Sequence, residues 1–446
     1  MDTVKYLDAM VSDSTPARRP TSRQNQLLGP YVALLLLILI YFSRPGEWIP
    51  GLTNVPLVKL TAIWALFALV FSLRHIRQRL PREVIYLGLL IGQLFLAAVM
   101  SPVWRGGAFQ TTLGFAKVLV VVIILTVTVN TPKRLRLLIT IQAASVAVIA
   151  AVTAWYGHLR VGRLEGMRGG SYSNPNDLAL AIVISLPLCF ALLFLCRRRL
   201  WKAVWAIAML AMAYAVLLTG SRGGFLSLIV VVAFCLWEFG IRGRQRYLFV
   251  LVGLAGAILW LSSSGMLAGR LKGTFNSEED VASAYGSAQA RQDLFWHSVD
   301  VTKRHPLFGV GPGNFQVLSG DWHVTHNAFT EMSSEGGVPA FILYVSILWL
   351  GFKNVRAAKL AGMQKEIATL AGGLQASLAG YVVGSIFAST AYEFFPYFLV
   401  AYSTSLFLIS KKSAFRMKLR KSGEQTTTEE ELLPNAVKSE LAWHSY

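Results

Sequence analysis

Two arginines and one histidine, far apart in the chain, are the side chains best suited to chemistry. Arg222 lies in a short turn, Arg291 lies on a predicted amphipathic helix, and His326 directly precedes Asn327. A guanidinium group stays charged at any physiological pH and matches the geometry of phosphate. A neutral imidazole accepts a proton near pH 7. These residue types predict a site that holds an anion and removes a proton.

The turn around Arg222 reads Thr219-Gly220-Ser221-Arg222-Gly223-Gly224 and joins two apolar runs. Its glycines would let a bulky anionic headgroup approach the backbone. We therefore expect Ser221, Arg222 and Gly223 to bind substrate. The alternative is that Arg222 only reaches toward lipid headgroups.

A predicted helix over residues 284–303 carries Arg291 near one apolar face, with Ala288, Phe295 and Val299. His305-Pro306 should end this helix, because proline disfavours helical geometry in the residue before it. An arginine on such a face is unusual for a purely solvated charge, which favours a functional role.

His326-Asn327 should begin a short helix over residues 328–335, with Asn327 as its cap. The positive helix end disfavours an imidazolium ion, so His326 is expected to be neutral. His323 and His326 alone make a poor zinc site, and we predict no metal. The alternative is a histidine that merely forms hydrogen bonds in its loop. The glycine-rich Gly309–Asn314 is interpreted as a tight turn, because it lacks the features of a nucleotide-binding loop.

The loop over residues 157–177 is rich in arginine and glycine. Arg160, Arg163 and Arg168 would form a surface for acidic or phosphorylated groups. Arg168 and Asn176 are predicted substrate-binding residues. Alternatively, Asn176 or Asp177 only caps the apolar run that follows.

Composition places these residues on a membrane protein. The chain has 446 residues, of which 54% are hydrophobic and 15% charged. Apolar runs of about 20 residues fit membrane-spanning helices. We predict an all-α integral membrane protein with about twelve spans and a partly helical periplasmic loop between spans 9 and 10. The predicted spans are 27–42, 55–73, 83–100, 110–129, 135–156, 178–196, 200–219, 223–240, 247–264, 338–352, 366–387 and 395–410.

Basic residues cluster at alternate connections, which explains the net charge of +19 without nucleic acid. The positive-inside rule puts these connections in the cytoplasm. Both termini are then cytoplasmic. The expected divisions are an N-terminal tail (1–26), a transmembrane domain (27–410) with a large periplasmic catalytic loop (262–337), and a C-terminal tail (411–446). No cleavable signal peptide is predicted.

Several motifs together resemble the O-antigen ligase and polymerase superfamily. They are Ser221-Arg222-Gly223, Arg291 with Trp296, Pro306–Phe315 (PLFGVGPGNF), His326-Asn327 and Glu335-Gly336-Gly337. The resemblance covers about residues 165–345. Members are polytopic glycosyltransferases of bacterial surface polysaccharide synthesis.

The resemblance implies a glycan carried on undecaprenyl pyrophosphate in the bacterial inner membrane. This glycan would be moved at the periplasmic face to an acceptor hydroxyl, on lipid A–core or another glycan, without metal or cofactor. Arg222 and Arg291 would hold the pyrophosphate, and His326 would activate the acceptor, with Asn327 at the site. Arg270 or Arg304 could stand in place of Arg291.

The subtype stays open between a ligase, our first choice, a polymerase of lipid-linked repeats and a protein O-oligosaccharyltransferase. A twelve-span transporter is the alternative of a different class, and it predicts charged residues deep within the spans. The spans contain few such residues. A scaffold for polysaccharide assembly would leave the outer arginines without a role.

Overall fold

The computed structural model of the chain describes residues 27–49, 51–52, 55–72, 80–160, 163–166, 172, 174–262, 278–319, 323–361 and 364–432. The predicted N-terminal tail and residues 433–446 of the predicted C-terminal tail therefore fall outside the described residues, as do Arg168 and Arg270. Residues 411–432 of the predicted C-terminal tail belong to a helix.

Each of the twelve predicted apolar runs contains a helix. In order they are α3 (Leu28–Ser43), α5 (Leu57–Ser72), α6 (Arg82–Val99), α7 (Arg105–Thr128), α8 (Pro132–Tyr156), α9 (Pro175–Leu195), α10 (Arg199–Thr219), α11 (Arg222–Cys235), α12 (Tyr247–Ser262), α16 (Ala328–Ala361), α17 (Lys365–Gly384) and α18 (Phe395–Leu432). Short α4 (Pro45–Trp48) follows α3, and the π-helix η2 (Leu236–Arg242) continues α11.

The protein is an all-α integral membrane protein. Within the described residues, nine helical segments are long and apolar enough to cross a membrane. Leu57–Ser72 and Tyr247–Ala257 are apolar but shorter, and α18 begins with an apolar stretch before its basic part. The prediction of an all-α membrane protein is confirmed, while the count of twelve spans stays a prediction.

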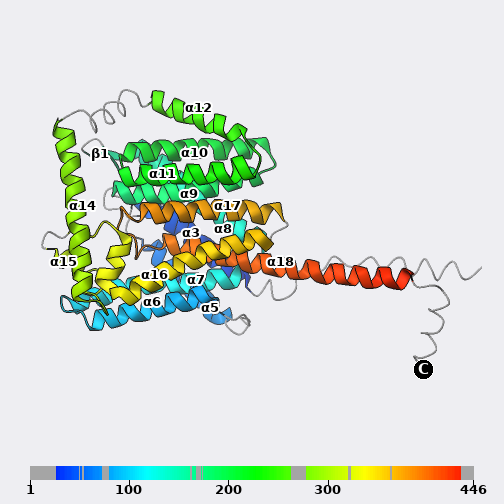
Figure 1. The fold of residues 1–446 in the computed structure, drawn as a ribbon, viewed down its shortest axis with the longest axis horizontal. Coiled ribbons are helices and arrows are strands. Elements are labelled where there is room, and N and C mark those ends of the chain that lie inside the picture. Colours follow the sequence, from blue (N-terminus) through cyan, green and yellow to red (C-terminus); the bar gives the residue numbers. More distant parts are fainter. Residues whose placement is uncertain are drawn as a thin grey trace, which may run out of the picture.

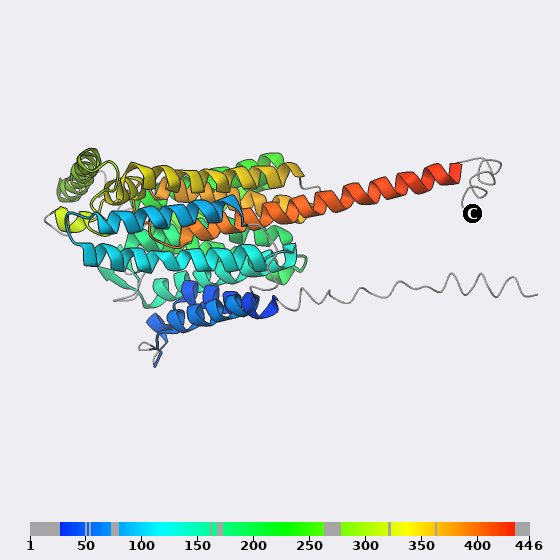
Figure 2. The ribbon, with the colours of Figure 1, turned by 90° about the horizontal axis from the view of Figure 1, so that it is seen from below.

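The long helices run side by side as a bundle, and α14 (Glu278–Arg304) lies across one end of it, roughly perpendicular to the others (Figure 1). Short α15 (Phe315–Leu318) and the start of α16 lie at this same end. The last part of α18 projects beyond the opposite end (Figure 2). Residues 222, 291 and 326 are thereby brought to the end that α14 covers, which we call the α14 end.

Two details differ from the sequence-based expectation. The loop after α8 contains a small antiparallel hairpin, β1 (His158–Arg160) with β2 (Arg163–Glu165), that was not predicted. The N-cap of α9 is Asn174, whose side chain accepts a hydrogen bond from the Asn176 backbone N–H. The expected caps, Asn176 and Asp177, are wrong because Pro175 begins the helix at its first position, where its missing N–H costs nothing.

Predicted elements around the histidine are mostly confirmed. The helix that carries Arg291 begins earlier than expected but ends at Arg304, directly before His305-Pro306. Asn327 accepts hydrogen bonds from the N–H groups of Phe329 and Thr330 at 2.9 and 3.2 Å, so it caps α16. Gly337 interrupts α16 with a φ of 79°.

Candidate functional site

The turn before α11 presents Arg222 at the first position of the helix. Ser221 caps α11 by accepting a hydrogen bond from the Gly224 N–H at 3.1 Å. Gly220 ends α10 with a φ of 56°, in the left-handed region that glycine adopts without strain. Arg222 itself is exposed. The local sequence therefore places a guanidinium group at the N-terminus of α11, and the two together favour an anion.

Gly223 is close to another part of the chain. A Cβ atom at this position would lie 2.5 Å from Cβ of Phe387, a contact that real side chains do not make. The space beside Gly223 is thus filled by protein, whereas the sequence suggested that a headgroup would approach there. A role for Gly223 in binding substrate stays a prediction.

Arg163 and Asn176 support the same turn. Arg163 donates from Nε to the Thr219 carbonyl at 3.0 Å and from Nη2 to Oδ1 of Asn176 at 3.1 Å. The Ser221 hydroxyl donates to the same Oδ1 at 2.8 Å. The carbonyl oxygen of Asn176 therefore serves to hold Ser221 and Arg163 in place. Arg163 was expected only as part of a basic surface, and the hairpin that positions it was not foreseen.

Arg291 lies close enough to Arg222 for their charges to interact. It is half-buried, and its pKa is lowered by burial and then by the positive charge of Arg222. Arg304, the alternative on the same helix, pairs with Asp300 at 2.8 Å and is largely exposed. Arg304 is thus paired with a carboxylate, whereas the charge of Arg291 interacts with that of Arg222. Two neighbouring cations repel each other, so this arrangement favours an anion between them.

His326 completes the cluster. Its pKa is lowered by burial, then by the charge of Arg291 and then by His323. Arg222 thus acts on Arg291, and Arg291 acts on His326, which places all three in one electrostatic neighbourhood. An imidazole whose pKa lies below its ordinary value is neutral at pH 7 and can accept a proton.

The backbone of His326 is unusual. Its φ is 52°, a left-handed backbone value that residues other than glycine adopt only at a cost in free energy. Its N–H donates to the Ser389 hydroxyl at 2.8 Å, and that hydroxyl also lies 3.0 Å from Oγ1 of Thr325. Ser389 was missed from the sequence, because a serine in an uncharged stretch carries no recognisable signal.

The glycine-rich connection after α14 is a structural turn, as expected. Gly309, Gly311 and Gly313 all have positive φ. Glu335, buried in α16, accepts hydrogen bonds from the N–H groups of Gly313 at 2.7 Å and Phe315 at 3.2 Å. This connection fixes the end of α14 against the first part of α16, so that Arg291 and His326 belong to one packed unit.

A second polar cluster lies on α3 and the segment before α18. The Arg44 guanidinium lies over the ring of Tyr41 at 4.6 Å, and Tyr41 donates to Glu393 at 3.4 Å. Burial raises the pKa of Glu393, and the charge of Arg44 opposes this. Glu393, which lies between α17 and α18, was not among the predicted site residues.

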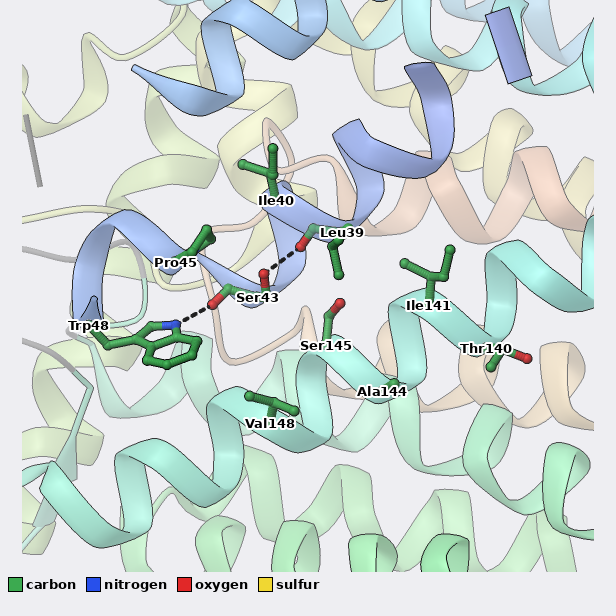
Figure 3. Close-up of a pocket in the computed structure, with 10 residues that line it drawn as sticks. All are labelled: Leu39, Ile40, Ser43, Pro45, Trp48, Thr140, Ile141, Ala144, Ser145 and Val148. Atoms are coloured by element: carbon green, nitrogen blue, oxygen red, sulfur yellow. Dashed lines mark hydrogen bonds between the residues drawn. The ribbon is translucent and has the colours of Figure 1, made fainter. Parts of the chain in front are cut away.

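A hollow of about 400 Å³ lies between α3 and α8, lined mainly by apolar side chains (Figure 3). Among its polar groups, the Ser43 hydroxyl donates to the Leu39 carbonyl and the Trp48 indole donates to the Ser43 carbonyl. It contains no charged side chain to hold phosphate or to remove a proton. The arginine and histidine cluster stays the candidate site.

The described residues include no group of three or more histidines, cysteines or carboxylates that could hold a metal ion. His326 also lies near Arg291, whose positive charge would oppose a bound cation.

Comparison with known proteins finds a match over part of the chain. Residues 207–345 match the family model described as O-Antigen ligase. This segment of the chain is similar to the O-antigen ligase family. No curated protein matches the chain.

The O-antigen ligase family implies a glycosyltransferase-type enzyme that acts on lipid-linked glycans in a membrane. The matched segment begins within α10 and ends within α16. It contains Arg222, Arg291 and His326, but it stops before α17, α18 and Ser389. Ser389, which accepts a hydrogen bond from the His326 backbone, thus comes from the part of the chain after the matched segment.

Proposed function

We propose that the protein transfers a glycan from undecaprenyl pyrophosphate to an acceptor hydroxyl, as an O-antigen ligase, at the periplasmic face of the bacterial inner membrane. The observation that carries this proposal is the electrostatic influence of Arg222 on Arg291 and of Arg291 on His326, three residues from distant parts of the chain. A dianionic group between two arginines, next to a neutral base, fits this reaction.

In the proposed reaction the acceptor oxygen attacks the anomeric carbon of the donor sugar. The bond between that carbon and the pyrophosphate oxygen breaks, and the pyrophosphate leaves with the electron pair. His326 takes the proton of the acceptor hydroxyl. Arg222 and Arg291 stabilise the charge that develops on the leaving oxygens. Ser221, Asn176 and Asn327 hold the two helix ends that present these groups, and Arg168 remains a proposed contact to the donor.

A test compares matched arginines on one helix. Arg291→Ala should abolish transfer from a lipid-linked donor by purified protein in lipid nanodiscs, and Arg304→Ala should leave it nearly unchanged. Arg222→Ala should abolish transfer as well. Arg222→Lys should restore only part, because lysine lacks the fork that binds phosphate in two places. Full activity of Arg222→Ala or Arg291→Ala would remove that residue from the proposed site.

His326→Ala should lower the transfer rate by about 10²- to 10⁴-fold, the usual contribution of general acid–base catalysis. The donor should still bind, because both arginines are intact. His323→Ala, which removes an exposed neighbour, is the matched control and should have a much smaller effect. Weak donor binding with a normal rate at saturation would make His326 a donor ligand and not the base.

Polymerases of lipid-linked repeats and protein O-oligosaccharyltransferases would use the same donor chemistry. The surface glycan of a deletion strain separates them. Polymer that accumulates on the lipid carrier supports a ligase, single repeats on the acceptor support a polymerase, and loss of glycan from protein supports the third subtype.

A further inference from the structure

We propose that the connection between α17 and α18, residues 385–391, is a spacer that sets the separation of Arg222 and His326, with Ser389 as the positioning residue of the imidazole. This inference rests on the proposed function for its catalytic consequence. The spacer lies outside the segment that matches the O-antigen ligase family.

The spacer is attached to the start of α16 at three points. The Ser389 hydroxyl accepts from the His326 N–H at 2.8 Å. The Ser385 carbonyl accepts from the Ala328 N–H at 2.8 Å. The Ala391 N–H donates to Oε2 of Glu331 at 3.0 Å. The backbone of His326 and the first turn of α16 are thereby held against the spacer.

The opposite side of the spacer lies against α11. Phe387 fills the space beside Gly223, the residue after Arg222, so closely that no side chain fits there. One turn earlier, Cβ at Gly384 would lie 2.4 Å from Leu180 and 3.2 Å from the Ser227 hydroxyl. The Ser227 hydroxyl in turn donates to the Gly380 carbonyl. α17 and the spacer therefore separate the helix of Arg222 from the helix of His326 by a fixed packing distance.

The left-handed backbone of His326 depends on its hydrogen bond to Ser389. Such a conformation persists only where the surroundings hold it. The Ser389 hydroxyl is an acceptor for the His326 N–H, and without it the turn can relax toward an ordinary conformation. A displacement of about 1 Å at a reacting group can cost about 100-fold in rate. A single hydroxyl outside the matched segment should therefore influence transfer.

The first measurement is a distance and needs no activity. Spin labels at residues 225 and 323, both exposed, report the separation of the two helix starts in protein that lacks its three native cysteines. The native protein should give one narrow distance distribution in nanodiscs. Ser389→Ala should shift or broaden it. Ser403→Ala is the matched control, because Ser403 is a buried α18 serine that donates only to its own helix, at the Leu399 carbonyl.

The second measurement is transfer by unlabelled protein. Ser389→Ala should lower kcat about 10- to 100-fold with little change in the KM for donor. Ser389→Thr keeps the hydroxyl and should retain most of the activity. In a His326→Ala background, Ser389→Ala should cause no further loss, because the serine acts through the imidazole.

An equal loss from Ser389→Ala in both backgrounds would overturn the positioning role. So would an unchanged kcat together with an unchanged distance distribution. If instead His326→Ala transfers normally while Ser389→Ala still shifts the distance, the spacer stands and the proposed base fails. If Ser389→Ala does not fold, Gly223→Ala supplies the distance test. Gly223→Ala must displace Phe387, and an unchanged distance there would contradict the spacer.

Discussion

The buried carboxylate of Glu335 allows a quantitative prediction. Glu335→Ala removes the acceptor of two backbone N–H groups, those of Gly313 and Phe315. A buried donor left without an acceptor costs about 1–3 kcal/mol. Phe315 is buried and should incur this cost, whereas Gly313 is partly exposed and can recover part of it from water. We expect a total destabilisation of roughly 2–4 kcal/mol.

The assay uses the buried thiols of the protein. Cys189 and Cys235 are buried and free, so a thiol-reactive fluorogenic dye reports their exposure on heating once Cys196 is replaced by serine. Glu335→Ala should lower the apparent melting temperature clearly. The control is Glu366→Ala, which breaks a partly exposed ion pair with Arg136. Such pairs contribute about 0–1 kcal/mol. Equal melting temperatures for the two variants would refute the account of the glycine-rich connection.

Other predictions concern the site and its orientation. The pKa of His326 is lowered from the ordinary histidine value of about 6.5. The imidazole therefore becomes protonated only at a pH below that value, and the acid limb of the kcat/KM profile should lie there too. Arg291→Gln removes a nearby cation and should raise the pKa, measured as the pH dependence of His326 modification by diethylpyrocarbonate; an unchanged profile would contradict the contact. Transfer should survive EDTA, because the described residues offer His323 and His326 no third ligand and His326 lies near the cationic Arg291; loss on chelation that one divalent ion reverses would refute this. Single cysteines at positions 319 and 362 should react oppositely with an impermeant maleimide in intact cells, position 319 from outside; equal labelling would overturn the orientation.

The helices could be predicted because long apolar runs have few alternatives in a membrane. The N-cap residues of the helices were harder to predict, because one turn can contain several polar residues that are suitable as caps. Asn174, Asn176 and Asp177 are all good cap residues, and only Pro175 decides among them. The hairpin of β1 and β2 was missed because its two strands have three residues each, too few to show alternation.

The charged members of the candidate site could be predicted from residue type and context. Arg222, Arg291 and His326 are conspicuous on a chain with few charges. Their support was not predictable, because Ser389 and Phe387 are ordinary residues that matter only through contacts with distant positions. Glycine was ambiguous for a related reason. Gly223 suggested room for a ligand, whereas the structure fills that room with Phe387.

The attachment of His326 to Ser389 bears on how the protein is made. The ribosome synthesises the chain from its N-terminus. Ser389 lies 63 residues after His326, so it has not yet been added when the segment with His326 leaves the ribosome. The turn at His326 cannot take its final form until α17 and the start of α18 have been inserted. A nascent chain that ends after α16 already has every charged group of the site, yet it lacks the segment that arranges them. The enzyme is thus expected to gain its activity only at the end of its own synthesis, when the membrane domain is complete.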